Sequence, residues 1–379
     1  MVKEEKLKND NENSSLEWMK KVRKAFQNQT FLYILRRTLS ALLTLFLLVI
    51  VVICLIRLIP DSYFYNIKDY KEQIRKNGQL AADCWKGMML YQYGRTDIKG
   101  NYKPLIVSIA QYIYWILPIY KKVPLAYNLT YTEVIKYWEG FIYFGRSMQS
   151  GNYVIDDLTS KMGISFTISI ITVILTYLFA LPLGVAMAKK PGGVVDKIAN
   201  VFIVLNYAIP GLVFYLVMWS VFGDANGLFG QAFGYYYDSA RFWTLVPPIF
   251  CMVFLGIPGV CIWVRRYMVD ELSSDYVKFA RSKGLSENKI MYTHVLRNAC
   301  IPLVRSIPST LLGAFVGSYY IEVIWHIPGT GGLLINALQV YDIPVIQSLT
   351  FIYAAISMLS FLLGDIITVF FDPRIKLTK

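Results

Sequence analysis

The sequence predicts an all-α polytopic membrane protein with six transmembrane helices, an extracytoplasmic insertion between the first and second helices, and both termini in the cytoplasm. Hydrophobic residues make up 55% of the 379 residues, above the roughly 45–50% typical of soluble domains. They gather into runs of about 20 residues, the length that a helix needs to cross a ~30 Å hydrocarbon core. Basic residues cluster beside these runs, as they do in membrane proteins.

Six apolar runs with few charges mark the predicted spans. The first follows a long, charged N-terminal segment and has no small-residue cleavage site after it, so we expect it to remain as an anchor. Asn206, Pro210 and Gly211 interrupt the third run and predict a bend there. The six runs are Leu39–Ile59, Gly163–Ala188, Ile198–Phe222, Thr244–Val264, Ile301–Val323 and Ile346–Phe371.

The distribution of basic residues predicts the orientation of the spans, because positively charged segments resist translocation. Residues 1–37 carry nine Lys or Arg and residues 265–297 carry seven. The segment 224–243 carries one, and 324–345 carries none. We therefore assign the clusters of basic residues, which account for much of the formal charge of +13, to the cytoplasmic side of the membrane. The sequence has no separate basic domain of the kind that binds nucleic acid.

These boundaries divide the chain into five regions. They are a cytoplasmic tail (1–30), the first transmembrane helix (31–60), an extracytoplasmic domain (61–162), a five-helix core (163–371) that contains a cytoplasmic loop (265–300), and a cytoplasmic tail (372–379). One apolar stretch, Leu105–Ile119, is short for a span. We interpret it as a buried or interfacial helix of the extracytoplasmic domain, with a seventh span as the alternative.

The loop at 265–300 carries the most informative pattern. Gly284 separates two helical segments, since glycine is a strong breaker of helical periodicity. Ser286 and Glu287 follow as an N-cap and a first-turn acid for the second segment. A helix, a glycine turn and a second helix facing the cytoplasm form a rigid element that is suited to transmit force from a soluble partner.

The run YVKFARSKGLSENKIMYTHVLRNACIPLV resembles the cytoplasmic coupling loop of bacterial ABC importer permeases, in particular the B-type subunit of the oligopeptide and dipeptide family. The segments FLYILRRTLSALLTLFLLVIVVICLIRLIPDS, FGRSMQSGNYVIDDL, EVIWHIPGTGGLLINALQVYDIPVIQ and FFDPRIKL are also similar to that family. Residues 1–30 and about 64–128 have no clear counterpart. Lys278 stands where the wider importer pattern has an acid, and Arg297 stands where it has proline. These differences put individual salt bridges between the loop and an ATPase in doubt, but they do not put the docking of the loop on the ATPase in doubt.

The resemblance implies a peptide importer in which this chain is a transport subunit and not an enzyme. It implies that the chain lies in a lipid membrane and has three kinds of protein partner. These are a second, C-type permease subunit, two ABC ATPase subunits and an extracytoplasmic peptide-binding protein. The chain has no G-x-x-x-x-G-K-[ST] motif, so it should bind no cofactor, and ATP and Mg should bind to the ATPases. The alternative substrate is nickel, a metal chelate or another small solute. The residues expected to couple to the ATPase are Tyr276, Ala280, Arg281, Lys283, Gly284, Leu285 and Ser286.

Several polar residues within the spans have two interpretations. Arg305 and Asp365 lie at similar depths from the cytoplasmic side, so we expect a structural ion pair, with a contact to the substrate as the alternative. Ser169 and Thr172 belong to a hydroxyl stripe that either lines the path or packs against a neighbouring helix. Glu322 either lies at the gate, where it binds a peptide amine, or caps nearby backbone.

Other classes of protein fit the sequence less well. An intramembrane protease would need a nucleophile or paired acids at one depth, and a secondary transporter would show repeated halves. Neither pattern is present. His294 and His326 fall on opposite sides of the predicted membrane, so no metal site is expected from them.

Overall fold

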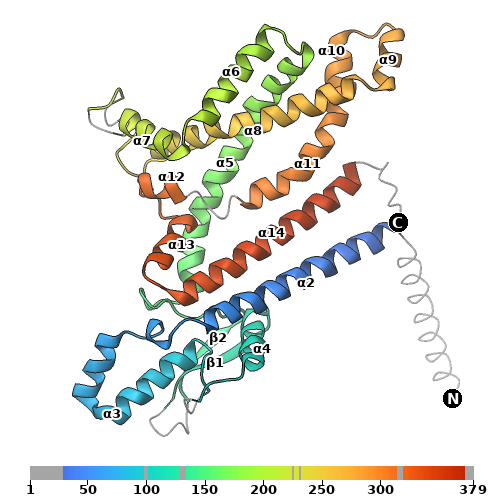
Figure 1. Cartoon of the computed structure of the whole chain (residues 1–379). Coiled ribbons are helices and arrows are strands. Elements are labelled where there is room, and N and C mark those ends of the chain that lie inside the picture. Colours follow the sequence, from blue (N-terminus) through green and yellow to red (C-terminus); the bar gives the residue numbers. More distant parts are fainter. Residues whose placement is uncertain are drawn as a thin grey trace, which may run out of the picture.

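The structure is a computed structural model of the chain, and it is mostly helical (Figure 1). It describes residues 29–97, 101–127, 134–223, 226–229, 232–313 and 319–371. The predicted N-terminal tail, apart from its last two residues, and the predicted C-terminal tail at 372–379 lie outside the described residues.

Four helices among the described residues are long and apolar enough to cross a membrane. Each covers all or most of one of the predicted spans, because uninterrupted apolar runs can satisfy all their backbone groups only as helices in lipid. These helices are α2 (Gln29–Arg57), α5 (Val154–Lys189), α8 (Val246–Leu272) and α14 (Ile343–Phe371).

The predicted third span is a broken helix. Helix α6 (Val194–Ala208) and α7 (Gly211–Phe222) meet at an angle of 95°. The break falls at Ile209 and Pro210, because proline has no backbone N–H to donate to the preceding turn. The Asn206 side chain donates a 3.0 Å hydrogen bond to the carbonyl of Phe254 in α8. The bend predicted from the sequence is confirmed.

The predicted fifth span is described in two pieces. Helix α11 (Leu296–Gly313) begins it and α12 (Tyr319–Ile324) ends it, while residues 314–318, with Gly317, lie outside the described residues. Helix α11 contains two arginines and two prolines and is not among the helices apolar enough to count as spans. The described residues thus contain four candidate spans, or five if the bent pair counts as one span. The predicted fifth span, which would bring the total to six, remains a prediction.

The insertion between α2 and α5 contains the only departure from the expected all-α class in the described residues. Strands β1 (Lys121–Tyr127) and β2 (Val134–Gly140) form an antiparallel pair in which Val123 lies opposite Trp138. Alternating side chains let one face of the pair, with Val123 and Leu125, pack on a helix while the other faces outward. We did not predict these two strands from the alternating pattern of their sequence.

Two helices complete the insertion. Helix α3 (Ile67–Gln92) is kinked at Gly78, whose φ is +81°. Helix α4 (Leu105–Ile116) has 12 residues and is about 18 Å long at ~1.5 Å per residue, so it is too short to be a seventh span. It packs Tyr112 and Trp115 against α2 and β1, as expected of a helix that belongs to the insertion.

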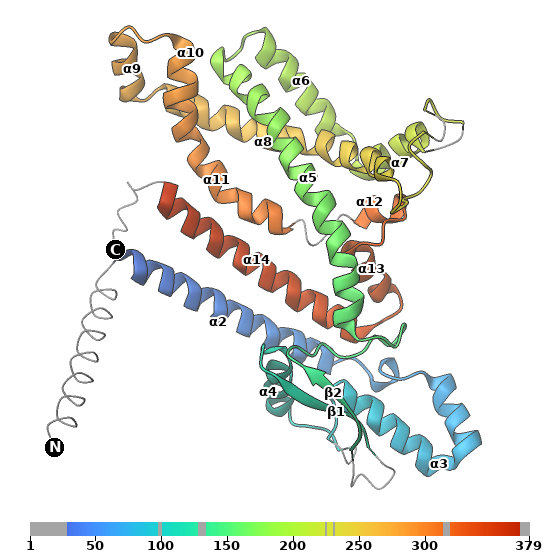
Figure 2. The ribbon, with the colours of Figure 1, turned by 180° about the vertical axis from the view of Figure 1, so that it is seen from behind.

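Figures 1 and 2 show that α2 and α14 lie side by side, with the start of α2 near the end of α14. The insertion gathers at one end of the bundle, and α9 (Asp275–Ser282) and α10 (Glu287–Lys289) lie at the opposite end. Helix α5 packs along α8, and α11 along α14. The two ends of the described chain therefore approach the bundle from the same side, in keeping with the predicted topology.

Candidate functional site

The loop between α8 and α11 forms a helix, a tight turn and a second helix. Gly284 has a φ of +74°, a left-handed conformation that glycine adopts at little cost. The N–H of Gly284 donates to the carbonyl of Arg281 (2.9 Å), and that of Leu285 to the carbonyl of Ala280 (3.3 Å). This pair of bonds is the Schellman ending of a helix. Helix α10 then continues through a π-helical turn (Ile290–Val295) into α11.

The inner side of this loop is fixed to the bundle by apolar packing. Five of its side chains are buried with residues of α5 and α8 in one cluster, and each contributes roughly 0.8–3 kcal/mol by its burial. The Lys189 ammonium at the end of α5 also donates a 2.8 Å hydrogen bond to the Asn288 side chain. The buried loop residues are Val277, Ala280, Ile290, Met291 and Val295. Any displacement of the loop is therefore passed to α5 and α8.

The outer side of the loop is cationic with one aromatic group. Phe279 is 60% exposed, and the Lys283 ammonium lies 4.3 Å from its ring centre. Arg281 forms an ion pair of 2.8 Å with Glu287. Burial of an aromatic side chain supplies much of the free energy in protein interfaces, so Phe279 is the strongest contact group on this surface. The sequence suggests Phe279 as an apolar contact group of this helix, but we did not count it among the residues expected to couple to the ATPase.

The predicted coupling residues divide between these two sides. Arg281, Lys283, Gly284 and Ser286 are exposed. Ala280, in contrast, is 7% exposed and packs into the cluster beneath the loop. Two more are half-buried: Leu285, and Tyr276, whose hydroxyl donates to Glu271 (2.6 Å). These three positions are suited to hold the loop in place, and the four exposed ones to touch a partner.

A buried ion pair lies near the same end of the bundle and was not predicted. Arg265 of α8 donates two hydrogen bonds, of 2.6 and 2.8 Å, to the Asp196 carboxylate of α6. Asp196 also accepts the N–H of Gly192 at 2.8 Å. A two-bond arginine–carboxylate contact fixes both direction and distance, so it locks α6 to α8. The sequence signal was an acid just before the third span and an arginine just after the fourth.

Arg305 and Asp365, predicted to pair, lie 2.8 Å apart in α11 and α14. A third charge joins them, because Nε of Arg37 in α2 lies 3.3 Å from the other oxygen of Asp365. A Cβ atom at Gly364 would come within 2.5 Å of the Arg305 carbonyl, so this glycine lets α11 and α14 approach closely. One carboxylate thus links three helices.

Glu322, predicted to lie at the gate or to cap backbone, is 3% exposed. Its carboxylate accepts hydrogen bonds from the Ser165 hydroxyl (2.8 Å) and from the N–H of Gly332 (2.9 Å). Gly332 lies in the first turn of α13 (Thr330–Gln339), where free N–H groups favour an anion. A Cβ atom at Gly329 would lie 2.2 Å from the carboxyl carbon. The glycines of this segment therefore form a close cradle around Glu322.

Ser169 and Thr172 lie on the side of α5 that packs against α8. Both are buried, and the Thr172 hydroxyl lies 3.8 Å from the sulfur of Met252. Further along the stripe, a Cβ atom at Gly256 would come within 3.1 Å of the Thr176 hydroxyl. In this conformation the hydroxyl stripe lies in the contact between α5 and α8. A role for it in lining the translocation path stays a prediction.

A groove between α5, α8 and α11 holds a cavity of about 250 Å³. Its lining combines aromatic rings with hydroxyl groups and carries no charge: it includes Tyr177, Trp263, Tyr267, Ser306 and Thr310. Lipid-facing surfaces are usually aliphatic, whereas rings and hydroxyls can bind amide groups. Among the described residues, no group of three or more His, Cys, Asp or Glu side chains is placed to hold a metal ion.

Comparison with known proteins agrees with this arrangement. A family described as "Binding-protein-dependent transport system inner membrane component" matches residues 180–377. The oligopeptide transport system permease protein AmiC of Streptococcus pneumoniae is 36% identical over 211 residues, which are 55% of this chain and 42% of AmiC. The chain thus matches less than half the length of AmiC.

Two dipeptide transport system permease proteins named DppB match nearly end to end. That of Lactococcus lactis is 29% identical over 355 residues, which cover 91% of this chain and 99% of the relative. That of Bacillus subtilis is 26% identical over 352 residues, covering 92% and 98%. The similarity extends through the bundle, the loop with α9 and α10, and the insertion.

Proposed function

The chain belongs to the family of binding-protein-dependent transport system inner membrane components, and we propose that it is one permease subunit of an ATP-driven importer of oligopeptides. The names of its relatives support peptides as the substrate. It is a multi-pass protein of the cell membrane. Six spans with both termini in the cytoplasm complete the proposed topology.

The proposed machine has three other kinds of component. A second permease of the C-type completes the path, two ABC ATPases bind the cytoplasmic side, and an extracytoplasmic protein delivers the peptide. The chain lacks a phosphate-binding G-x-x-x-x-G-K-[ST] motif, so ATP and Mg bind to the ATPases. This chain contributes movement and a path, and no covalent chemistry.

The packing of the loop between α8 and α11 is the observation that carries the proposal. Its inner side is buried against α5 and α8, and its outer side presents Phe279 among cations. Closure of the ATPases on ATP pushes this rigid element, and the push moves α5 and α8 together. ATP binding thereby shifts the population of the bundle between two conformations.

The groove between α5, α8 and α11 is the proposed contribution of this subunit to the path. Uncharged hydroxyls and aromatic rings bind the backbone that all peptides share and select little among side chains. Helix α12, which carries Glu322, and helix α13 lie at the opposite end of the bundle from α9 (Figure 2). We assign them to the outer gate, where the carboxylate fixes the position of α13.

Cross-linking to the ATPase tests the proposal. Ser286→Cys is placed in a background without the five native cysteines, and the complex is trapped with ATP and vanadate. We expect this cysteine to cross-link to the co-purified ATPase, while Leu80→Cys, in the insertion and 87% exposed, does not. A membrane-impermeant thiol reagent should label Leu80→Cys in intact cells and leave Ser286→Cys unlabelled. The reverse labelling pattern would contradict the topology and the function together.

The substrate is tested separately on the cognate binding protein. Peptides of different lengths should raise its melting temperature, whereas nickel salts and metal chelates should not. Stabilisation by a metal complex alone would reassign the importer to the alternative substrate class without changing the role of this subunit.

A further inference from the structure

A second cavity lies between the bundle and the insertion. It has a volume of about 50 Å³ and is enclosed by the end of α2, by α4, by residues 92–95 and by the start of α14. At ~10–15 Å³ for each water-sized group, it has room for three to five such groups. Its apolar lining includes Ile53, Trp115 and Ile343. Nothing in the proposed transport cycle uses this cavity.

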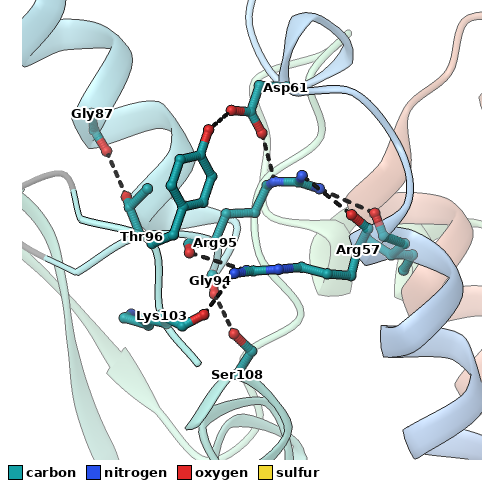
Figure 3. A network of polar contacts seen from close by, with 10 residues as sticks. Arg57, Asp61, Gly87, Gly94, Arg95, Thr96, Lys103 and Ser108 are labelled. Atoms are coloured by element: carbon teal, nitrogen blue, oxygen red, sulfur yellow. Dashed lines mark hydrogen bonds and ion pairs between the residues drawn. The ribbon is translucent and has the colours of Figure 1, made fainter. Parts of the chain in front are cut away.

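Two arginines, Arg57 and Arg95, line the cavity, and Figure 3 shows the polar contacts that they make. Arg57, the last residue of α2, donates hydrogen bonds to the carbonyls of Arg95 (3.2 Å) and Lys103 (2.6 Å). Arg95 donates to the carbonyl of Ile56 (3.1 Å) and pairs with Asp61 (2.9 Å). Within the part of the chain that the structure describes, Arg57 has no carboxylate partner. The lining of the cavity therefore carries two cations, and the nearby carboxylate of Asp61, which pairs with Arg95, is not part of that lining.

The surroundings of Arg95 disfavour its charged form. Burial, together with repulsion from Arg57, lowers the pKa of Arg95, although Asp61 opposes the effect. An anion in the cavity would relieve this repulsion. Guanidinium groups bind phosphate well, because their planar N–H groups match two oxygens at once.

A buried hydroxyl adds a further donor. Tyr112 lines the cavity, is 7% exposed, and its hydroxyl has no hydrogen-bond partner among the described residues. A buried polar atom without a partner usually costs about 1–3 kcal/mol, so such atoms often mark a site for a ligand. Of the polar groups in the cavity lining, Arg57 and Arg95 already donate to backbone carbonyls and to Asp61, whereas the Tyr112 hydroxyl still has a donor to offer.

The surroundings of the cavity are those of a lipid boundary. Leu55 and Leu58 at the end of α2 are 59% and 80% exposed, and α4 exposes Ile106 (79%) and Tyr114 (47%) on the side away from its buried Tyr112. The cavity thus lies at the end of a candidate span, where phospholipid headgroups are found. Basic pockets beside transmembrane helices are known to hold anionic headgroups.

We propose that this cavity binds the phosphate of an anionic phospholipid, held by Arg57, Arg95 and the Tyr112 hydroxyl, with the acyl chains along the exposed side of α2. The lipid joins the insertion to the first span. This inference rests on the cavity and the membrane location, and it holds whatever the transported solute.

Thermal unfolding of the full-length chain in nanodiscs tests the proposal. Phosphatidylglycerol should raise the melting temperature more than phosphatidylcholine does. Arg57→Gln should remove at least half of this difference, and Arg57→Lys, which keeps the charge, should retain most of it. Arg75→Gln, an exposed cation of α3 in the same insertion, should behave as wild type.

Three results would overturn the proposal. One is a phosphatidylglycerol effect that Arg57→Gln leaves intact, and another is an equal effect from inorganic phosphate in phosphatidylcholine discs. The third comes from the unmodified chain, so it does not depend on the folding of a variant: photoactivatable phosphatidylglycerol should cross-link within residues 53–57, 92–95 or 343–347. Cross-links found only elsewhere would exclude the site.

Discussion

The Ser147 hydroxyl donates a 2.5 Å hydrogen bond to the carboxylate of Asp342, which is 195 residues away in the sequence. Asp342 also accepts the backbone N–H groups of Met148 (3.1 Å) and Gln149 (3.3 Å). The carboxylate is 2% exposed. It therefore ties the segment before α5 to the start of α14.

Loss of this carboxylate should lower stability strongly. Asp342→Ala leaves the buried Ser147 hydroxyl without its acceptor, at about 1–3 kcal/mol, and removes an acceptor from the less buried N–H groups of Met148 and Gln149. We therefore expect a loss of at least ~1 kcal/mol and a clear fall in melting temperature. Asp342→Asn keeps one acceptor oxygen and should lose less. Asp156→Ala, an exposed acid nearby, is the control. Equal melting temperatures for the alanine variants would contradict this role.

The turn at Gly284 offers a test with a matched control. Gly284 and Gly192 have φ values of +74° and +73°, and a Cβ atom at either would meet nothing within 4 Å. Alanine at either site should therefore cost a similar ~1–2 kcal/mol of backbone strain. Only Gly284→Ala should also reduce ATP-driven peptide uptake, because that turn sets the angle between α9 and α10. Equal loss of uptake in both variants would show that the turn has no special role.

Asp365 should behave as the centre of a three-residue cluster. Arg305→Asp and Asp365→Arg should each lower the melting temperature, since each leaves like charges together in a partly buried place. The double variant should recover only part of the loss, because Arg37 would then face a second arginine. Adding Arg37→Gln to the double variant should recover more. No recovery in either combination would mean that the pairs contribute nothing to stability.

The insertion should become more stable as the pH rises above 8. Burial lowers the pKa of Lys103 from an ordinary 10.5 to about 8, with Asp97 opposing the effect. Between these two values the unfolded chain holds a proton that the folded chain has released, so stability rises with pH across that window. Below pH 8 both states are protonated and the cost of burying the charge is present in full.

The measurement compares melting temperatures from pH 7.5 to 10.5 in the wild type and in Lys103→Met. As the pH rises, the melting temperature of the wild type should increase relative to that of Lys103→Met. Lys86 is a cation elsewhere in the insertion, and Lys86→Met should show the same pH dependence as the wild type. A constant difference between the wild type and Lys103→Met would mean that Lys103 keeps its ordinary pKa.

Local patterns in the sequence predicted the elements of this protein well. The runs that became α2, α5, α8 and α14, the break at Pro210, and the two helices around Gly284 all follow from residues next to one another. The strands β1 and β2 were missed, because their alternation spans only seven residues each within an insertion of mixed composition. A short segment takes its conformation largely from what packs against it.

Residue partners were harder to predict than elements. The similar predicted depths of Arg305 and Asp365 in the membrane were enough to suggest that these two residues pair. They gave no sign that Arg37 joins them or that Asp196 pairs with Arg265. The inward direction of Ala280 was also missed, because the buried side of an eight-residue helix depends on the cluster beneath it.

The sequence by itself determined that this chain enters a membrane and where its four long apolar helices lie, because the free energy of transfer into lipid is a sum over neighbouring residues. Only the tertiary structure decided which charges meet, which side of the loop is free for a partner, and where a cavity lined by two arginines and an unpartnered tyrosine hydroxyl forms. Those features depend on distances between segments as far apart in the sequence as Arg37 and Asp365, and such distances exist only once the helices have packed.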